Sequence, residues 1–175
     1  MRQEYPINLD LKSFFLRPDT PPEGRPRAEN EQEPTLPEPL RTRALEAGLD
    51  AMRRPPFVAA SRKAHEATEY AKEQGKGVEF HRAVYEAYWE QGLNIGDSQV
   101  LEGLANDTGL EWIPLKSLLD EGFYGNSVEE QNHEITNFGV HGVPCFLIDR
   151  FLFTGAQPYE FFKQVADRVL AERAL

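Results

Sequence analysis

The only cysteine of the chain, Cys145, is the residue with the most reactive side chain. A thiol can form a mixed disulfide, and a nearby histidine such as His141 can take its proton. We do not expect these two residues to form a catalytic pair, because Pro144 lies between them and no third residue is placed to orient the imidazole. We favour the alternative that Cys145 is a small apolar residue at the start of a buried strand. We therefore predict no catalytic residue, with Cys145 as a candidate thiol only.

The remaining residues that could bind a metal lack the required spacing. His65, His81 and His133 fall in separate predicted helices, without the His-x-x-x-His spacing of a zinc site, so we predict no metal. Pairs of acidic residues recur along the predicted helices, and such pairs are typical of solvated helix faces.

The stretch Gly139–Phe153 predicts a β-hairpin. Two short apolar runs flank Asp149-Arg150, and apolar runs bounded by turn residues are typical of buried strands. Pro144 cannot donate a hydrogen bond to a neighbouring strand, so we place it at the start of the first strand. The Val143-Pro144 bond is also a place where a cis peptide is plausible.

The rest of the chain predicts one further strand, a loop and a series of helices. Tyr5–Leu16 alternates between apolar and polar residues at its start, as a half-buried strand does. Asp19–Pro39 contains six prolines and must be a loop, either a solvated arm or a lid. Apolar residues at helical spacing then predict the following helices: Thr42–Arg53, Phe57–Gln74, Val78–Leu93, Ser98–Asn106 with Asp97 as N-cap, Pro114–Glu121, Ser127–Phe138 and Tyr159–Arg173.

This order of elements predicts an α/β fold with a large all-helical insertion, in contrast to a βαβαβ repeat. A chain of 175 residues suits one domain. Within it we expect a sheet and closing helix from residues 1–18 and 139–175, a proline-rich acidic loop at 19–39, and the helical insertion at 40–138.

Composition and charge exclude several classes of protein. The formal net charge of −10 argues against nucleic acid, whose phosphates require a basic surface, and against an anionic membrane surface. We find neither a run of 18 apolar residues nor an apolar segment that would form a secretory signal. A single cysteine suits a reducing compartment, so we expect a cytoplasmic protein without contacts to membrane or nucleic acid.

The motif Gly-Val-x-Gly-Val-Pro-x-Phe at residues 139–146, with Thr-Gly-Ala-Gln-Pro at 154–158, resembles the C-terminal half of the DsbA-like thioredoxin-fold family. The resemblance is closest to the FrnE-type branch, with hydroxychromene-carboxylate isomerases and kappa-class glutathione transferases as relatives. It implies a thioredoxin-like fold, a cis bond before Pro144, and a substrate groove beside that proline. The residues expected to bind an extended peptide, a thiol substrate or glutathione are His141, Val143, Pro144, Cys145 and Gln157.

The chain departs from this family in its redox motif. The family carries a Cys-x-x-Cys at a helix N-terminus, where the helix dipole lowers the pKa of the first thiol, and this chain has no second cysteine. The resemblance also implies that the first core strand is missing, which leaves a gap of about 10 Å between unpaired strand edges. The gap could be closed by pairing Ile7–Leu16 with Cys145–Ile148, by a strand of a second copy, or by residues upstream of this sequence. We favour a homodimer.

Two functions agree with these features. The first is a DsbA-family thiol–disulfide oxidoreductase by lineage, redox-inactive in this chain because the catalytic dithiol is absent. The second is a non-catalytic module, similar to the isomerases and transferases, that binds a peptide or glutathione in the groove at Val143-Pro144. In the first case we expect no cofactor, and in the second glutathione is the possible one.

Overall fold

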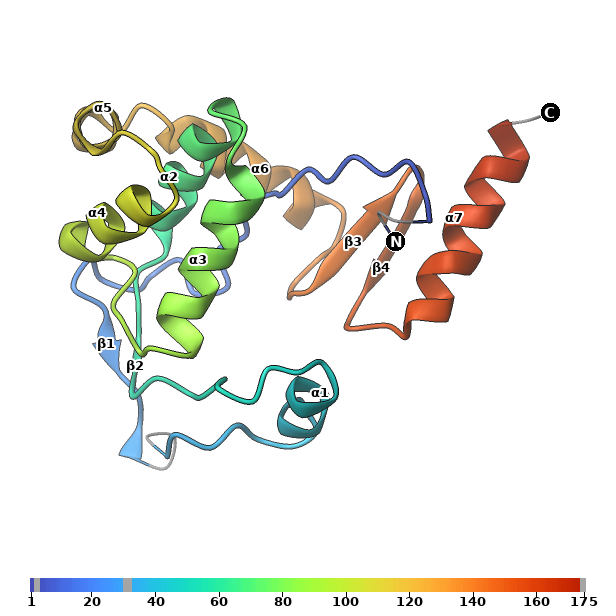
Figure 1. The fold of residues 1–175 in the computed structure, drawn as a ribbon, viewed down its shortest axis with the longest axis horizontal. Coiled ribbons are helices and arrows are strands. Elements are labelled where there is room, and N and C mark those ends of the chain that lie inside the picture. The colour runs from blue at the N-terminus through green and yellow to red at the C-terminus, as the bar shows by residue number, and fades with distance from the viewer. Residues whose placement is uncertain (2–3, 30–32, 174–175) are drawn as a thin grey trace. The chain divides into compact units, whose positions relative to one another are not determined.

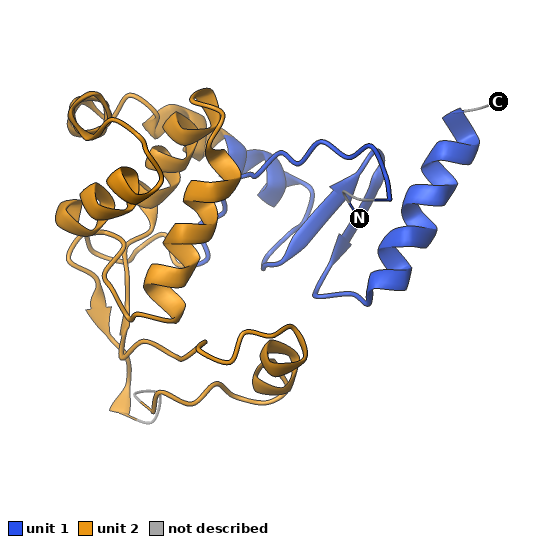
Figure 2. Cartoon of the chain, in the orientation of Figure 1, with its two compact units in different colours: residues 1–16, 131–175 blue, residues 17–130 orange. Residues whose placement is uncertain are grey.

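The computed structural model describes residues 1, 4–29 and 33–173. These residues divide into two compact units, the first formed by Met1–Leu16 with Gln131–Leu175 and the second by Arg17–Glu130 (Figure 2). Residues 30–32 of the predicted loop Asp19–Pro39 lie outside the described part of the chain.

The second unit contains two short strands and most of the helices (Figure 1). Its elements, in chain order, are β1 (Arg25–Pro26), α1 (Leu40–Glu46), β2 (Phe57–Val58), α2 (Arg62–Glu73), α3 (Gly77–Trp89), α4 (Ser98–Asp107) and α5 (Trp112–Glu121). Helix α6 (Gly125–Asn137) begins in this unit and ends in the first.

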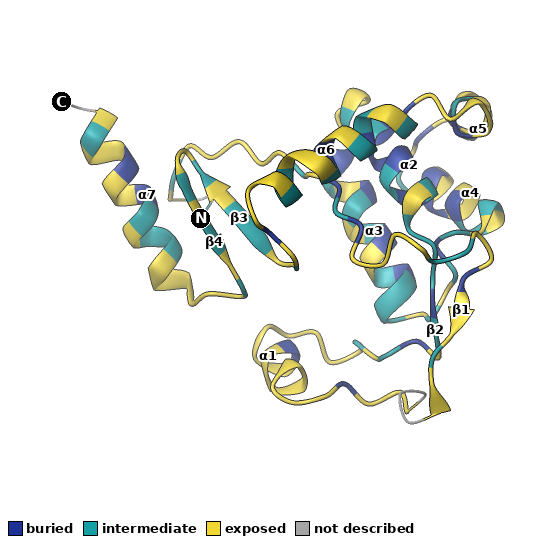
Figure 3. Ribbon diagram, turned by 180° about the vertical axis from the view of Figure 1, so that it is seen from behind, coloured by how far each residue is buried: buried dark blue, intermediate teal, exposed yellow. Residues whose placement is uncertain are grey.

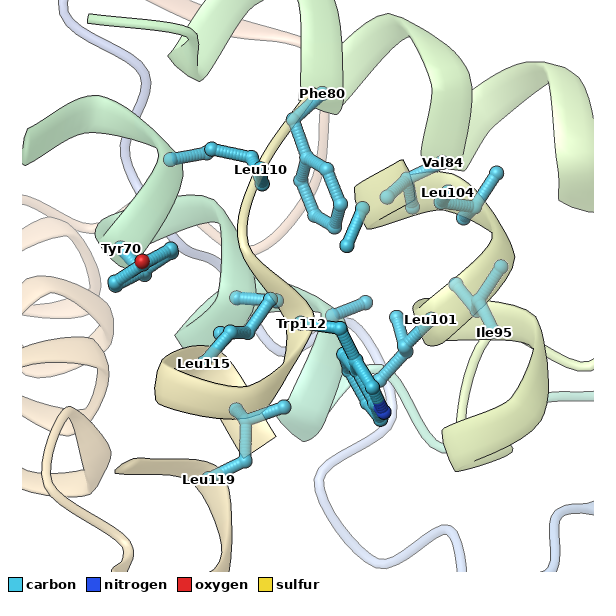
Figure 4. Packing of buried hydrophobic residues seen from close by; sticks show 14 of the residues in the cluster. Tyr70, Phe80, Val84, Ile95, Leu101, Leu104, Leu110, Trp112, Leu115 and Leu119 are labelled. Atoms are coloured by element: carbon cyan, nitrogen blue, oxygen red, sulfur yellow. The ribbon is translucent and has the colours of Figure 1, made fainter. Parts of the chain in front are cut away.

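The core of the second unit forms where the apolar faces of α2 to α5 meet (Figure 4). Phe80 of α3, Leu101 of α4 and Leu115 of α5 are completely buried. Alanines on the inner face of α2, including Ala67 and Ala71, are also fully buried, and their small side chains let α3 approach closely. The apolar residues that predict the helix Val78–Leu93 therefore include core residues, among them Phe80 and Val84.

Asp97 and Gly109 lie at the beginning and the end of α4. The Asp97 side chain accepts a hydrogen bond from the Gln99 N–H at 2.8 Å, so the predicted N-cap is confirmed. Gly109, with φ of +70°, follows the helix in the left-handed region that glycine adopts without strain. Lys76 donates to the carbonyl oxygens of Thr108 and Gly109, which neutralises the negative end of the helix dipole.

The first unit is a hairpin covered on one face by a helix. Strands β3 (Cys145–Ile148) and β4 (Phe151–Thr154) pair antiparallel through the two-residue turn Asp149-Arg150, and α7 (Tyr159–Arg173) follows. The predicted hairpin and closing helix are confirmed. On one face of the hairpin, Phe146 and Phe153 stack at 5.5 Å and meet Phe162 of α7 edge to face.

The strand predicted at Tyr5–Leu16 is wrong, because no residue of this segment belongs to a described sheet. Two of its backbone N–H groups instead bond to side chains in the middle of α6. The Ser13 N–H donates to Gln131 Oε1 at 2.8 Å, and the Phe15 N–H donates to Asn132 Oδ1 at 2.9 Å. These amide side chains supply two of the acceptors that a neighbouring strand would have supplied. In the described sheets β3 pairs with β4 alone, so the alternative in which Ile7–Leu16 pairs with Cys145–Ile148 is not observed.

The helix predicted at Phe57–Gln74 begins five residues late, and the two-residue strand β2 precedes it within the predicted helical insertion. Phe57-Val58 pairs with Arg25-Pro26, which adds a short strand to the predicted loop and another to the insertion. Side-chain contacts hold Phe57 in place, since Tyr88 Oη donates to its carbonyl oxygen at 3.0 Å. A sequence pattern does not reveal such a contact between distant residues.

The helix predicted at Thr42–Arg53 is also shorter than expected, because α1 ends at Glu46 and the chain turns at Gly48.

No helix among the described residues is long and apolar enough to cross a membrane.

Candidate functional site

The segment before the hairpin, from Val140 to Val143, is anchored at its first residue and exposed at its last. Val140 is buried, and its N–H donates to the carbonyl oxygen of Ile135 in the last turn of α6. His141 is exposed, and 54% of the surface of Val143, three residues after Val140, is accessible. The Val143-Pro144 peptide bond is cis. This segment thus presents Val143 to solvent immediately before the first strand.

The pairing of β3 with β4 determines which backbone groups remain free. In an antiparallel pair, residues exchange backbone hydrogen bonds at every second position. Ile148 and Phe151 flank the two-residue turn, and beyond the other end of the ladder the Gly155 N–H donates to the Pro144 carbonyl at 2.8 Å. The backbone groups of Pro144, Phe146 and Ile148 therefore point toward β4.

The alternate strand residues Cys145 and Leu147 then direct their N–H and C=O groups away from β4. No other strand pairs with β3 in the described sheets, and Val143 makes no backbone hydrogen bond to any described residue. The outer edge of β3 is therefore an open strand edge. Such an edge can accept an extended chain through main-chain hydrogen bonds.

The face of the hairpin opposite α7 is apolar and partly uncovered. Leu147 and Leu152 lie directly opposite each other on this face, and 59% of the surface of Leu147 is accessible. Val143, immediately before the cis bond, adds a further exposed apolar residue. Leu147 and Leu152 are not among the residues predicted from the sequence to bind a ligand. Strict alternation along the hairpin, with phenylalanines on one face and leucines on the other, is the sequence signal that indicates their shared face.

Cys145 lies at the start of β3, opposite Thr154, and is half-buried. Burial raises the pKa of its thiol, and the N–H of Phe146 offsets this effect only in part. A reactive cysteine requires the opposite shift, which an adjacent cation or a helix N-terminus would produce.

His141 is exposed and makes no hydrogen bond to Cys145 within the described residues. The structure therefore does not bring this histidine and the thiol together. Gln157, by contrast, lies close to the strand, because its Nε2 donates to the Thr154 carbonyl at 2.8 Å and its backbone N–H to that of Gly155. These bonds shape the loop after β4 and leave the Gln157 Oε1 atom available as an acceptor.

The site offers backbone groups and apolar surface but little acid–base chemistry. Among the residues that the structure describes, no three His, Cys, Asp or Glu side chains are grouped so that they could hold a metal ion. What this arrangement can do chemically is bind an extended chain along β3, with its side chains against Val143 and Leu147.

Comparison with known proteins identifies the fold to which this hairpin belongs. A family model described as DSBA-like thioredoxin domain matches residues 1–166. The chain is 32% identical over 103 residues to the uncharacterized protein YwbO of Bacillus subtilis (strain 168), an alignment that covers 58% of this chain and 51% of YwbO. The chain thus matches about half the length of this relative.

Two solved structures have similar folds. One is described as a probable DsbA oxidoreductase from Streptomyces coelicolor, with a TM-score of 0.69 and 27% identity over 75% of this chain and 57% of the other. The second is a 2-hydroxychromene-2-carboxylate isomerase, with a TM-score of 0.60 and 16% identity over 77% of this chain and 70% of the other.

Proposed function

The chain belongs to the DsbA-like thioredoxin domain family, and from this premise we propose that it binds extended thiol-containing peptides at the edge of β3 without performing a redox cycle itself. The open edge at Val143, Cys145 and Leu147 is the observation that carries the proposal. The family relationship supports a thiol–disulfide oxidoreductase lineage. The single cysteine of this sequence leaves no partner with which to form an intrachain disulfide.

The proposed binding residues divide by the groups that they contribute. Val143 offers its free N–H and C=O to the ligand backbone, as an edge strand does in β-augmentation. Pro144 and Cys145 border the same segment, and the Gln157 Oε1 atom is placed to accept a further hydrogen bond near Thr154. His141 is exposed on the approach to the hairpin and is proposed to contact the ligand beyond Val143.

Hydrogen exchange tests the proposed edge directly. The probe is a fluorescein-labelled octapeptide of alternating valine and threonine with one central cysteine, kept reduced. We expect its binding to slow exchange at the N–H groups of Val143 and Cys145. The N–H of Leu152, on the outer edge of β4, serves as the internal control and is expected to keep its rate. Equal protection of both edges, or saturable binding without protection of β3, would contradict the proposal.

Glutathione is the second candidate ligand, because it is itself a short extended peptide with a thiol. The similarity to an isomerase fold is compatible with it, and the free backbone groups of Val143 suit its peptide bonds. Stabilisation in a thermal melt that rises with glutathione concentration would support this candidate. The S-methyl derivative tests whether the thiol contributes, since main-chain pairing alone predicts equal stabilisation by both compounds.

The absence of redox activity has a separate test. Catalysed reduction of insulin by dithiothreitol requires a dithiol that alternates between two oxidation states. We expect this chain to leave the uncatalysed rate unchanged, with thioredoxin as the positive control. Robust turnover by this chain would contradict the proposal of redox inactivity and leave the proposed binding edge unaffected.

We further propose that, at high protein concentration and without ligand, a second copy of the chain pairs with β3 at Cys145–Ile148, so that the ligand and the partner strand compete for this edge. An antiparallel β3–β3 pair about a two-fold axis would use the outward groups of Cys145 and Leu147 on both copies. We place this homodimer in the cytoplasm, where a single thiol stays reduced. Light scattering that gives the monomer mass at all micromolar concentrations would contradict the dimer.

A further inference from the structure

Residues 34–54 of the second unit form a closed loop around a pocket that lies apart from the hairpin in sequence. The Arg54 N–H donates to the Pro34 carbonyl at 2.8 Å, which joins the two ends of the loop. The Arg53 N–H donates to the Trp89 carbonyl at 2.7 Å and ties the loop to the end of α3. Compact loops whose ends meet are frequently functional.

The pocket has a volume of about 270 Å³, and every residue that lines it lies between Pro34 and Arg53. Its shape follows from the short helix α1. The chain reverses at Gly48, with φ of +73°, and the Leu49 N–H donates to the Ala44 carbonyl at 2.8 Å. Leu49 is thereby brought back beside the helix that it follows.

The apolar lining of this pocket is incompletely covered by the chain itself. Leu36 and Ala44 are buried, whereas Leu45 and Leu49 have 51% and 45% of their surfaces exposed. Ala44 is the only buried residue of α1, as the exposed surface of this helix in Figure 3 illustrates. Covering Leu45 and Leu49 with an apolar ligand would be favourable because it removes apolar surface from water.

Two arginines supply charge at the same pocket. Arg41 and Arg53 both line it, and neither guanidinium has a hydrogen bond or ion pair with another described residue. Asp50 is the one carboxylate among the lining residues, so two positive charges and one negative charge leave a formal charge of +1. This local excess of positive charge contrasts with the net charge of −10 for the whole chain.

We propose that this pocket binds a monocarboxylate with an apolar chain, of the medium-chain fatty-acid type. Its carboxylate pairs with Arg41 or Arg53, since a guanidinium matches a carboxylate in both charge and fork geometry. Its apolar chain covers Leu45 and Leu49. The pocket volume lies just below the roughly 300–1,000 Å³ of most small-molecule sites, which restricts the ligand to a small one.

The lining distinguishes this ligand from other anions. A phosphate or a nucleotide carries two or more negative charges, and the Asp50 carboxylate opposes the second. A small hydrophilic anion such as acetate would leave Leu45 and Leu49 exposed. A ligand with only a charge, or only an apolar surface, would match just one part of the lining. A monocarboxylate with an apolar chain can contact both the arginines and the exposed leucines.

Calorimetric titration of the full chain with sodium octanoate tests the proposal, with 1-octanol and acetate as the two controls for charge and chain. We expect saturable binding of octanoate, and binding at least about tenfold weaker for either control, since hydrogen bonds to charged groups contribute strongly. Methyl chemical shifts of Leu45 and Leu49 are expected to move on addition of octanoate. These measurements need no substitution and therefore cannot fail through misfolding.

The double variant R41Q/R53Q is expected to bind octanoate at least about tenfold more weakly than the natural chain. R54Q, which removes the adjacent arginine that does not line the pocket, is the matched control and should bind within twofold. The proposal is overturned if octanoate does not bind saturably, if octanol binds equally well, or if R54Q weakens binding as much as the double variant. Because no hairpin residue lines the pocket, none of these outcomes bears on the proposed peptide-binding edge.

Discussion

Replacing Leu147 or Leu152 by proline separates the two edges of the hairpin. The two leucines lie opposite each other, and the backbone N–H of each points away from the partner strand. Neither proline therefore removes a hydrogen bond of the β3–β4 ladder, and proline is tolerated at such edge positions. L147P removes an N–H from the outer edge of β3, where we propose that a second copy pairs. L152P removes the equivalent group from the outer edge of β4.

The expected effect follows from the proposed two-fold symmetry, because one substitution removes two intermolecular N–H donors from the dimer. Each backbone hydrogen bond contributes a net stabilisation of about 0.5–1.5 kcal/mol, so the pair contributes about 2 kcal/mol. This corresponds to a dimer dissociation constant about 30-fold larger for L147P. The proline ring also occupies space next to the partner backbone, which makes this value a lower bound. L152P is expected to change the constant by less than about threefold.

Sedimentation equilibrium over a dilution series measures the dissociation constants of all three proteins. Far-ultraviolet circular dichroism and thermal melts of each variant establish that the hairpin unit is folded. Equal dissociation constants for L147P and L152P would refute pairing through β3. A natural chain that stays monomeric throughout would refute the dimer itself.

Three further predictions concern buried and reactive groups. Burial raises the pKa of Glu66, so its ionisation lowers the stability of the folded chain as the pH rises above the usual glutamate range. The variant E66Q should therefore raise the melting temperature at pH 7.5 but not at pH 4. An equal shift of the melting temperature at both pH values would contradict this. L115A should destabilise the chain by about 2–5 kcal/mol in urea unfolding because Leu115 is completely buried, whereas I113A, at an exposed position of α5, should cost less than about 0.5 kcal/mol. Burial raises the pKa of Cys145, so at pH 7.5 iodoacetamide should alkylate Cys145 more slowly than it alkylates the thiol of free glutathione. Faster alkylation of Cys145 would show an activated thiol.

The sequence by itself determined the elements that depend on neighbours along the chain. Asp97 caps α4 through a bond to the N–H two residues on, and Tyr159–Arg173 forms the predicted helix without a change of bounds. The hairpin joins strands separated by only two residues. The family motif at residues 139–146 also identified the thioredoxin-like fold, since its spacing is a property of the sequence alone. Each of these features is encoded within about 15 residues.

Only the tertiary structure decided what happens to segments whose partners are distant. Tyr5–Leu16 has a strand-like pattern, yet a strand forms only where another strand pairs with it, and the side chains of Gln131 and Asn132 take its N–H groups. The pocket around α1 likewise depends on the contact between Arg54 and Pro34, which are 20 positions apart. Alternation along β3 indicates which side chains share a face, but the free edge at Val143 appears only when the ladder and its register are known. Backbone hydrogen bonds between distant residues carry no local sequence signal, and for this reason only the tertiary structure shows which edge of the hairpin is open.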